Sequence, residues 1–181
     1  MAFLKVMDFE AKSVVAAIAL LMMAVQSSSE PLEDRTLAAP VGPVILEVSG
    51  SIQVKNSADG KALFDTEMLA RFAPHHFATS TTVTDGVKRF DGILVRDLLE
   101  QLGAKGTIAR ATALNDYLID IPIEDFMKFD VILAHSMDGE RLSVRDKGPL
   151  WIVYPRDHHS ELHDIRYDYR WVWQLRHIEI R

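Results

Sequence analysis

The chain has 181 residues, of which 48% are hydrophobic and 25% are charged, as expected for a globular protein with one substantial core. Its net charge of -6 and the absence of a stripe of Lys and Arg argue against binding to a nucleic-acid backbone. The sequence contains no cysteine, which excludes disulfides, thiol catalysis, thiolate metal ligands and a lipid-modified cysteine at the N-terminus.

The N-terminal residues have the pattern of a secretory signal peptide. Lys5 and Lys12 precede an apolar run at 14–25, and a short polar stretch rich in serine follows it. The run is shorter than the ~20 apolar residues that a membrane-spanning helix needs. We therefore expect a signal peptide at 1–27, cleavage after Ser27 and a mature protein in the periplasm. An uncleaved anchor is the alternative, because two acidic residues lie in the basic region.

Residues 28–43 contain three prolines and no hydrophobic periodicity, so we expect a flexible lead-in there. The remaining residues, 44–181, show the periodicities of short strands and helices. In chain order, the expected elements are a strand at 44–54, helices at 62–72 and 94–102, strands at 107–114 and 117–123, a helical turn at 124–129, a hairpin at 131–142, and strands at 149–155 and 172–180.

Local signals support the ends of three of these elements. Asp65 is suited to cap the first helix, and Gly103 is suited to the position that follows the second helix. The Asp138-Gly139 dipeptide is a strong two-residue turn signal within the hairpin. Strands outnumber helices and do not alternate regularly with them, so the sequence predicts an α+β fold rather than a doubly wound sheet.

Four segments stand in an order that is typical of a known family. They are FDGILVRDLLEQLGA (90–104), ALNDYLIDIPIEDF (113–126), DVILAHSMDGERLSVRDKGPLWIVYP (130–155) and RWVWQLRHIEI (170–180). Together they resemble the molybdopterin-binding domain of the sulfite oxidase family, and the similarity extends over nearly all of 44–181. The resemblance implies a single compact α+β domain with mixed β-sheets, short helices and a pterin pocket built from loops.

The resemblance also raises the question of the metal. In the molybdopterin enzymes a cysteine in the loop before the FDG segment ligates molybdenum, and that position falls at or near Ser80 here. A serine hydroxyl is a harder and much less acidic ligand than a thiol. We therefore expect a pterin-binding protein that is not an enzyme and has no catalytic residue. The alternatives are a molybdopterin-dependent oxidoreductase with a non-cysteine metal ligand and an accessory subunit of a redox complex.

A smaller branch of the same family is more similar still. The threonine-rich stretch TSTTVTDG (79–86) and the YRWVWQL segment (169–175) resemble short, exported, cysteine-free pterin-binding regulators. That resemblance implies binding of a metal-free, reduced pterin in the periplasm. It also implies contact with the periplasmic domain of a membrane-bound diguanylate cyclase or phosphodiesterase, an enzyme that makes or degrades cyclic di-GMP.

A pterin is a flat heteroaromatic ring with an amino group, a ring N–H and a carbonyl on one edge. A carboxylate can accept hydrogen bonds from the amino group and the ring N–H together, and apolar or aromatic groups can stack on the faces. Asn115, Asp116 and Tyr117 lie between two predicted strands, where Asp116 can accept from the edge and Tyr117 can stack. The alternative is a plain turn in which Asn and Asp bond to their own backbone.

Three further groups complete the candidate site. The hydroxyls near Ser80 and Thr82 can reach the ring, and the resemblance implies that a basic residue at the position of Arg170 holds the cofactor. In the strand at 149–155, Tyr154 is the better candidate for the pocket and Trp151 for the core, because they fall on opposite faces. The predicted ligand-binding residues are thus Ser80, Thr82, Asn115, Asp116, Tyr117, Tyr154, Arg170 and Trp173.

The segment 156–168 is polar and contains His158, His159 and His163 close to Glu161. A zinc site is conceivable there, but the spacing matches no established ligand pattern, so we expect no metal. We expect an exposed loop that borders the pocket and forms the contact surface for the protein partner.

Overall fold

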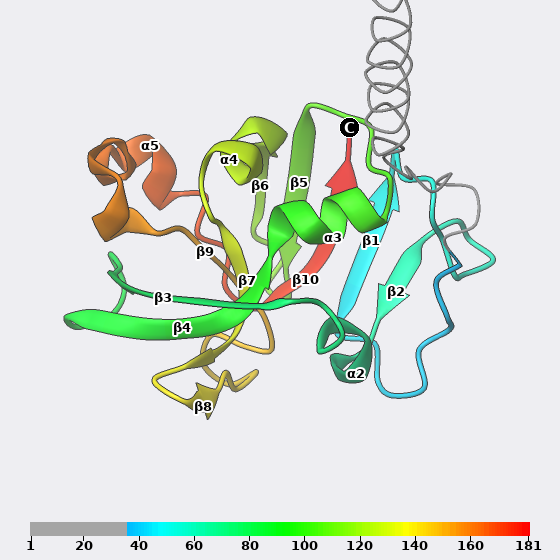
Figure 1. Cartoon of the computed structure of the whole chain (residues 1–181), viewed down its shortest axis with the longest axis horizontal. Coiled ribbons are helices and arrows are strands. Elements are labelled where there is room, and N and C mark those ends of the chain that lie inside the picture. Colours follow the sequence, from blue (N-terminus) through cyan, green and yellow to red (C-terminus); the bar gives the residue numbers. More distant parts are fainter. Residues whose placement is uncertain (1–35) are drawn as a thin grey trace, which may run out of the picture. The chain divides into compact units, whose positions relative to one another are not determined.

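Two five-stranded β-sheets dominate residues 36–181, the part of the chain that this computed structural model describes (Figure 1). The predicted signal peptide at 1–27 lies outside the described residues, as do residues 28–35 of the predicted lead-in. Within 36–181, no helix combines the length and the apolar content that a membrane crossing requires. The predicted α+β class, with mixed sheets and short helices, is confirmed.

The first sheet has the strand order β2-β1-β10-β5-β6. Its strands are β1 (Leu46–Gly50), β2 (Ala62–Phe64), β5 (Ile108–Ala113), β6 (Leu118–Pro122) and β10 (Leu175–Ile180). β1 runs parallel to β10, and the other neighbours are antiparallel. Alternate residues of β5 are buried, as the period of a strand with one covered face requires. The pairing of β1 with β10 brings the beginning and the end of the described chain together.

The second sheet is wholly antiparallel. Its strands are β3 (Pro74–Ser80), β4 (Val87–Leu94), β7 (Ile132–Met137), β8 (Glu140–Arg141) and β9 (Trp151–Val153). The hairpin of β3 and β4 was not predicted, because residues 74–80 are mostly polar and lack clear alternation. Gly92 in β4 is required where β4 crosses β7: a Cβ atom at this position would lie 2.2 Å from the carbonyl oxygen of Leu133.

The helices are short and connect the strands along the chain. They are α2 (Thr66–Leu69), α3 (Val95–Gln101), α4 (Ile123–Lys128), η2 (Arg156–His158), η3 (Ser160–His163) and α5 (Ile165–Asp168). The helix expected at 62–72 is instead strand β2 followed by one helical turn, because the edge of β1 pairs with residues 62–64. The loop expected at 156–168 is a series of three helical turns, anchored by the fully buried Leu162.

The predicted end signals are confirmed. Asp65 caps α2, with its Oδ1 accepting a hydrogen bond from the backbone N–H of Met68 at 2.9 Å. Gly103 follows α3 with a φ of 57°, the left-handed conformation that glycine adopts without strain. Asp138 and Gly139 have φ angles of 52° and 83°, as a tight hairpin turn requires.

Asp65 also holds the described part of the lead-in. Its Oδ2 accepts hydrogen bonds from the backbone N–H groups of Val41 and Gly42, each at 2.8 Å. These N–H donors, together with that of Met68, lower the pKa of the buried Asp65 carboxyl below its ordinary value. The residues just before β1 are therefore attached to the domain rather than free.

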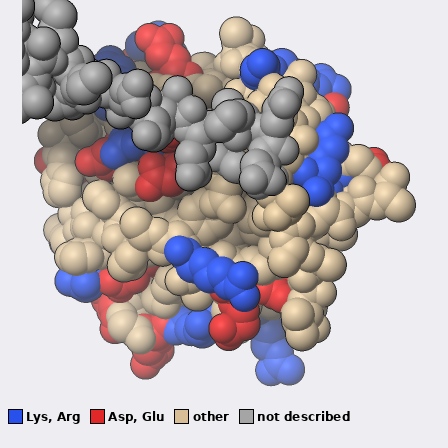
Figure 2. All heavy atoms as spheres, turned by 45° about the vertical axis from the view of Figure 1, so that its right-hand side comes forward, with Lys and Arg blue, Asp and Glu red and all other residues tan. Residues whose placement is uncertain are grey.

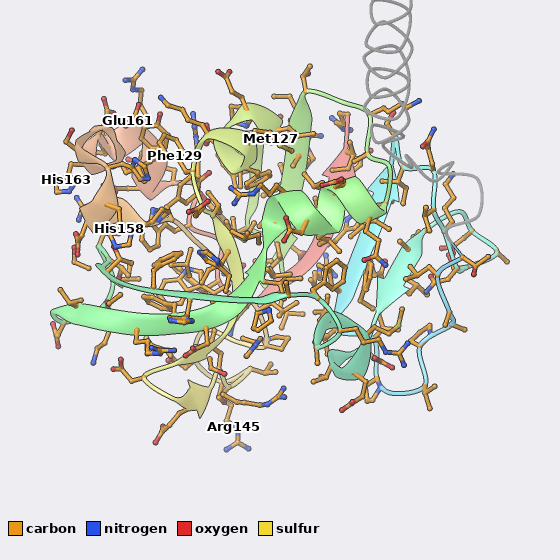
Figure 3. The ribbon with its side chains drawn as sticks, viewed as in Figure 1. Met127, Phe129, Arg145, His158, Glu161 and His163 are labelled. Atoms are coloured by element: carbon orange, nitrogen blue, oxygen red, sulfur yellow. The ribbon has the colours of Figure 1, made fainter. Side chains whose placement is uncertain are left out.

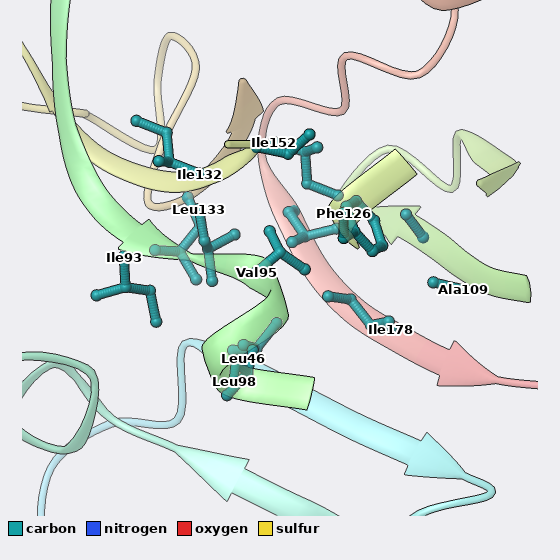
Figure 4. Packing of buried hydrophobic residues seen from close by; sticks show 14 of the residues in the cluster. Leu46, Ile93, Val95, Leu98, Ala109, Phe126, Ile132, Leu133, Ile152 and Ile178 are labelled. Carbon is teal, nitrogen blue, oxygen red and sulfur yellow. The ribbon is translucent and has the colours of Figure 1, made fainter. Parts of the chain in front are cut away.

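The hydrophobic core packs α3 and α4 against the strands of both sheets (Figure 4). Val95 and Leu98 of α3 are completely buried, as are Leu46 of β1 and Ile178 of β10. The apolar side of α3 therefore lies in the core. Figure 4 also shows Phe126 of α4 among these side chains, so one core supports both sheets.

The charged residues are mixed over the surface. On the face shown in Figure 2, acidic and basic side chains lie beside one another. Many form ion pairs, such as Arg110 with Asp120 at 2.7 Å and Arg96 with Asp130 at 2.6 Å. Exposed pairs of this kind contribute at most about 1 kcal/mol each. The visible face therefore has the character of an ordinary solvated surface.

Candidate functional site

A pocket of about 370 Å³ opens beside the C-terminal half of the domain. Its walls come from the β3–β4 connection, the end of β5 with the β5–β6 turn, α5, and the segment between α5 and β10. The lining residues are Thr82, Val83, Ala113, Asn115, Tyr117, Ile165, Asp168, Tyr169, Trp171 and Trp173. The size and the mainly apolar lining are those of a site for a small organic molecule.

Four aromatic side chains form much of the wall: Tyr117, Tyr169, Trp171 and Trp173. Trp171 is almost completely buried, whereas the other three are between 37% and 59% exposed and form the mouth. Behind the wall lies the fully buried Trp151, whose ring centroid is 6.3 Å from that of Trp171 and 6.5 Å from that of Trp173. Its edge-to-face packing fixes the positions of both rings.

The β5–β6 turn is joined to the opposite wall by a hydrogen bond. The Tyr117 hydroxyl donates to the backbone carbonyl of Tyr169 at 2.8 Å, and the Asn115 side-chain oxygen accepts from the backbone N–H of Tyr117 at 3.1 Å. Partial burial, followed by the neighbouring Tyr169, raises the pKa of the Tyr117 hydroxyl. Tyr117 therefore remains protonated at neutral pH and ties two pocket segments together.

Two lining residues carry a buried polar atom that has no hydrogen-bond partner within residues 36–181. One is Oδ1 of Asp168, an acceptor, and the other is Nε1 of Trp171, a donor. Buried polar atoms are nearly always satisfied in folded proteins, so each unpaired atom requires an explanation. Each of the two residues thus combines a place in the pocket wall with an unpaired polar atom that is covered by neighbouring atoms.

The structure brings half of the predicted ligand-binding residues to this pocket. Thr82, Asn115, Tyr117 and Trp173 line it. The other four predicted residues are absent from its lining: Ser80, Asp116, Tyr154 and Arg170.

Asp116 faces solvent instead of the pocket. Its side chain is 82% exposed, and its Oδ1 accepts a hydrogen bond from Arg176 at 2.7 Å. The backbone has a φ of 63°, so Asp116 occupies the left-handed position of the β5–β6 turn. The turn geometry therefore points the neighbouring Asn115 and Tyr117 to the pocket without the carboxylate between them.

Tyr154 and Arg170 belong to a polar cluster behind the pocket. The Tyr154 hydroxyl and an Arg170 N–H both donate to Oδ2 of Asp125, at 2.9 and 2.5 Å. Burial, then the charge of Asp125, raises the pKa of Tyr154 well above its ordinary value. The two residues act on the pocket indirectly, since the Tyr154 ring lies 6.1 Å from that of Trp171. We predicted that Tyr154 faces the pocket and that Trp151 lies in the core, but both side chains are fully buried.

Ser80 is held by a carboxylate. Its hydroxyl and its backbone N–H donate to the two side-chain oxygens of Asp157, both at 2.6 Å, and these bonds lower the pKa of Asp157. The Ser80 oxygen is thus committed to an internal contact and does not line the pocket. With no cysteine in the chain, the protein thiolate that ligates molybdenum in the enzymes of this kind is absent. The aromatic pocket, in contrast, fits a flat organic ring.

Two of the three histidines of 156–168 pack on aromatic rings. His158 lies 5.9 Å from Phe77 and His159 lies 5.1 Å from Phe129, measured between ring centroids. Figure 3 shows His158, Glu161 and His163 on this segment with Phe129 beside it. Glu161 forms an ion pair with Lys128 at 2.5 Å. Among residues 36–181, no three His, Asp or Glu side chains form a cluster that can hold a metal ion.

Sequence reasoning missed six lining residues: Val83, Ala113, Ile165, Asp168, Tyr169 and Trp171. Asp168 and Tyr169 stand directly before Arg170 and Trp171 in the chain, but Asp168 was the last residue of a segment expected to face a protein partner, and Tyr169 was assigned no role. The carboxylate of Asp168 and the aromatic ring of Tyr169 are side chains that suit a pterin site, and this signal was present in the sequence. What the sequence lacked was the α5 turn, which places Ile165 and Asp168 one helical turn apart and on the same face.

The mixed first sheet, the antiparallel second sheet and the short helices define a domain of the α+β class with an aromatic pocket built from loops. Residues 64–163 match the model of one family, the oxidoreductase molybdopterin-binding domain. The match covers more than half of the chain, and the chain belongs to this family. A comparison with curated proteins gives no match.

Proposed function

We propose that this domain binds a metal-free pterin in the aromatic pocket. The observation that carries the proposal is the set of four aromatic side chains around a cavity of about 370 Å³, a volume that suits a bicyclic ring. A flat heteroaromatic ring stacks favourably on Trp and Tyr faces, and the remaining polar atoms of the wall select its edge. A pterin has both the flat ring and the polar edge.

We propose a metal-free ligand because the chain lacks the side chains that would ligate molybdenum. The chain has no cysteine, and the hydroxyl of Ser80 donates to Asp157 rather than facing the pocket. We infer that the domain keeps the pterin-binding half of the family's chemistry and has lost oxygen-atom transfer. In that case it is a binding protein and not an enzyme.

We further propose that the domain acts in the periplasm by contact with a membrane-bound enzyme that makes or degrades cyclic di-GMP. The support is the resemblance to exported pterin-binding regulators, together with the position of α5. Ile165 and Tyr169 line the pocket and are also 62% and 59% exposed, so one segment contacts both the ligand site and solvent. Occupation of the pocket can therefore change the surface that a partner meets.

The test of pterin binding uses the full chain isolated after export. Titration with tetrahydropterin should quench tryptophan fluorescence, because all three tryptophans lie in the pocket wall or directly behind it. Metal analysis of the same protein should find molybdenum far below one atom per chain. Failure to bind any free pterin, combined with one tightly held molybdenum per chain, would refute the proposal and favour the oxidoreductase alternative.

A further inference from the structure

We propose that the Asp168 carboxylate determines which heterocycle the pocket accepts: it selects a ligand edge with adjacent N–H donors, as in a 2-amino-4-oxo ring. This inference rests on the proposed pterin binding and names the residue that makes the site specific. It assigns to Asp168 the role that the sequence suggested for Asp116.

The first step is the state of the carboxylate. Asp168 is one of the residues that line the pocket. Its Oδ1 is buried and has no hydrogen-bond or ion-pair partner anywhere in residues 36–181. The other acidic side chains near the site are engaged: Asp116 with Arg176, Asp157 with Ser80, and Asp125 with Tyr154 and Arg170. Within the described chain, the Asp168 carboxylate therefore has no partner, and its residue is part of the pocket wall, although Oδ1 itself is covered by neighbouring atoms.

The second step is the chemistry that such an acceptor demands. A buried acceptor without a donor is unfavourable, and a ligand N–H that reaches it removes this penalty and gains a charge-assisted hydrogen bond. A ring that presents a carbonyl oxygen at the same place leaves the oxygen unsatisfied and adds repulsion between two acceptors. A site of this kind rejects the carbonyl analogue more strongly than an apolar pocket can.

The third step is the opposite requirement at Trp171. Its buried Nε1–H lacks an acceptor within residues 36–181, and its ring is also part of the pocket wall. A ligand that complements the carboxylate of Asp168 and the indole N–H of Trp171 combines an N–H donor and a separate acceptor on one flat ring. A 2-amino-4-oxo heterocycle has both, whereas a hydrocarbon ring or a plain sugar lacks either the polar edge or the flat faces.

The experiment compares two ligands that differ at one substituent. Tetrahydropterin carries an amino group at position 2, and tetrahydrolumazine carries an oxo group there. Tryptophan fluorescence of the full chain measures both affinities, under anaerobic conditions, for the unaltered protein, Asp168→Asn and the control Asp116→Asn. Both substitutions remove one negative charge at nearly constant volume.

We expect the unaltered protein to bind tetrahydropterin in preference to tetrahydrolumazine. Asp168→Asn should weaken tetrahydropterin binding roughly 10- to 150-fold, the equivalent of one hydrogen bond to a charged group. It should weaken tetrahydrolumazine binding much less or improve it, because the amide can donate to the oxo group. Asp116→Asn should leave both affinities unchanged.

The outcomes distinguish pterin binding from the role of Asp168. If the unaltered protein binds neither ring, the proposed function fails. If it binds tetrahydropterin and Asp168→Asn keeps the same affinity and the same preference, pterin binding stands and the role of Asp168 is refuted. Thermal unfolding without ligand checks that the variants fold; should the amide variant not fold, Asp168→Ser replaces it, and an unchanged preference in that variant is equally decisive.

Discussion

At the scale of single residues, three carboxylates near the pocket have different roles because their surroundings differ. Asp116 is exposed and paired with Arg176, Asp125 lies in a buried cluster, and Asp168 carries an unpaired buried oxygen. Side-chain chemistry is identical in the three cases. Burial and partners decide which one stabilises the fold and which one is available to a ligand.

We expect the Asp125 cluster to be a main source of stability behind the pocket. Asp125→Ala removes the acceptor of both Tyr154 and Arg170 and leaves a buried hydroxyl and a partly buried guanidinium unpaired, so the free energy of unfolding should fall by about 3 kcal/mol. Tyr154→Phe leaves the pair of Asp125 and Arg170 intact and should cost only about 1.5 kcal/mol. Urea denaturation measures both values. Equal losses for the two variants would contradict a shared acceptor.

A second prediction concerns Asp65 and pH. Because its pKa is lower in the folded protein than the ordinary value of 3.8, its contribution to stability is present above that value. The contribution is lost as the pH falls through the lower pKa of the folded state. Asp65→Asn cannot titrate, so the stability difference between the two proteins should be largest near neutral pH and should shrink below pH 3.8. Thermal unfolding over this range tests the prediction; a constant difference would refute it.

At the scale of elements, the three helical turns of 156–168 connect the pocket to the outer surface. The first turn is attached to β3 through the hydrogen bonds of Asp157 with Ser80 and Thr79. The last turn, α5, supplies Ile165 and Asp168 to the pocket wall. A change in α5 upon ligand binding is therefore positioned to alter the charged surface of the same segment.

Charge reversal on this segment should separate ligand binding from partner control. The double variant Arg166→Glu with Glu161→Lys changes two exposed side chains that do not line the pocket. We expect pterin affinity within about twofold of the original, and loss of the pterin response in cyclic di-GMP turnover by membranes that contain the partner, because reversed charges oppose a complementary surface.

The matched control is Arg145→Glu with Glu140→Lys. Both side chains are exposed, and Figure 3 shows Arg145 far from the labelled side chains of 156–168. This control should keep the pterin response. Retention of the response in the segment variant, or its loss in both variants, would show that 156–168 is not a specific contact surface.

At the scale of the whole molecule, some features follow from neighbouring residues alone and were predictable. The cap at Asp65, the turn at Asp138-Gly139 and the glycine after α3 depend on local backbone conformations, and each was recognised in advance. The α+β class followed from the periods and the order of the elements. Tyr117 and Trp173 were also identified as candidates, because large flat side chains suit a ring-shaped ligand.

Other features depended on contacts between distant segments. The parallel pairing of β1 with β10, the β3–β4 hairpin and the Ser80–Asp157 contact join residues that are far apart in the chain or lack a local pattern. The choice between Asp116 and Asp168 is of this kind. Both lie next to a tyrosine in a polar stretch, and the sequence favoured Asp116. The turn at Asp116 leaves its side chain in solvent, whereas α5 makes Asp168 a lining residue of the pocket. The direction of a side chain is fixed by the tertiary fold around it rather than by its neighbours in the chain.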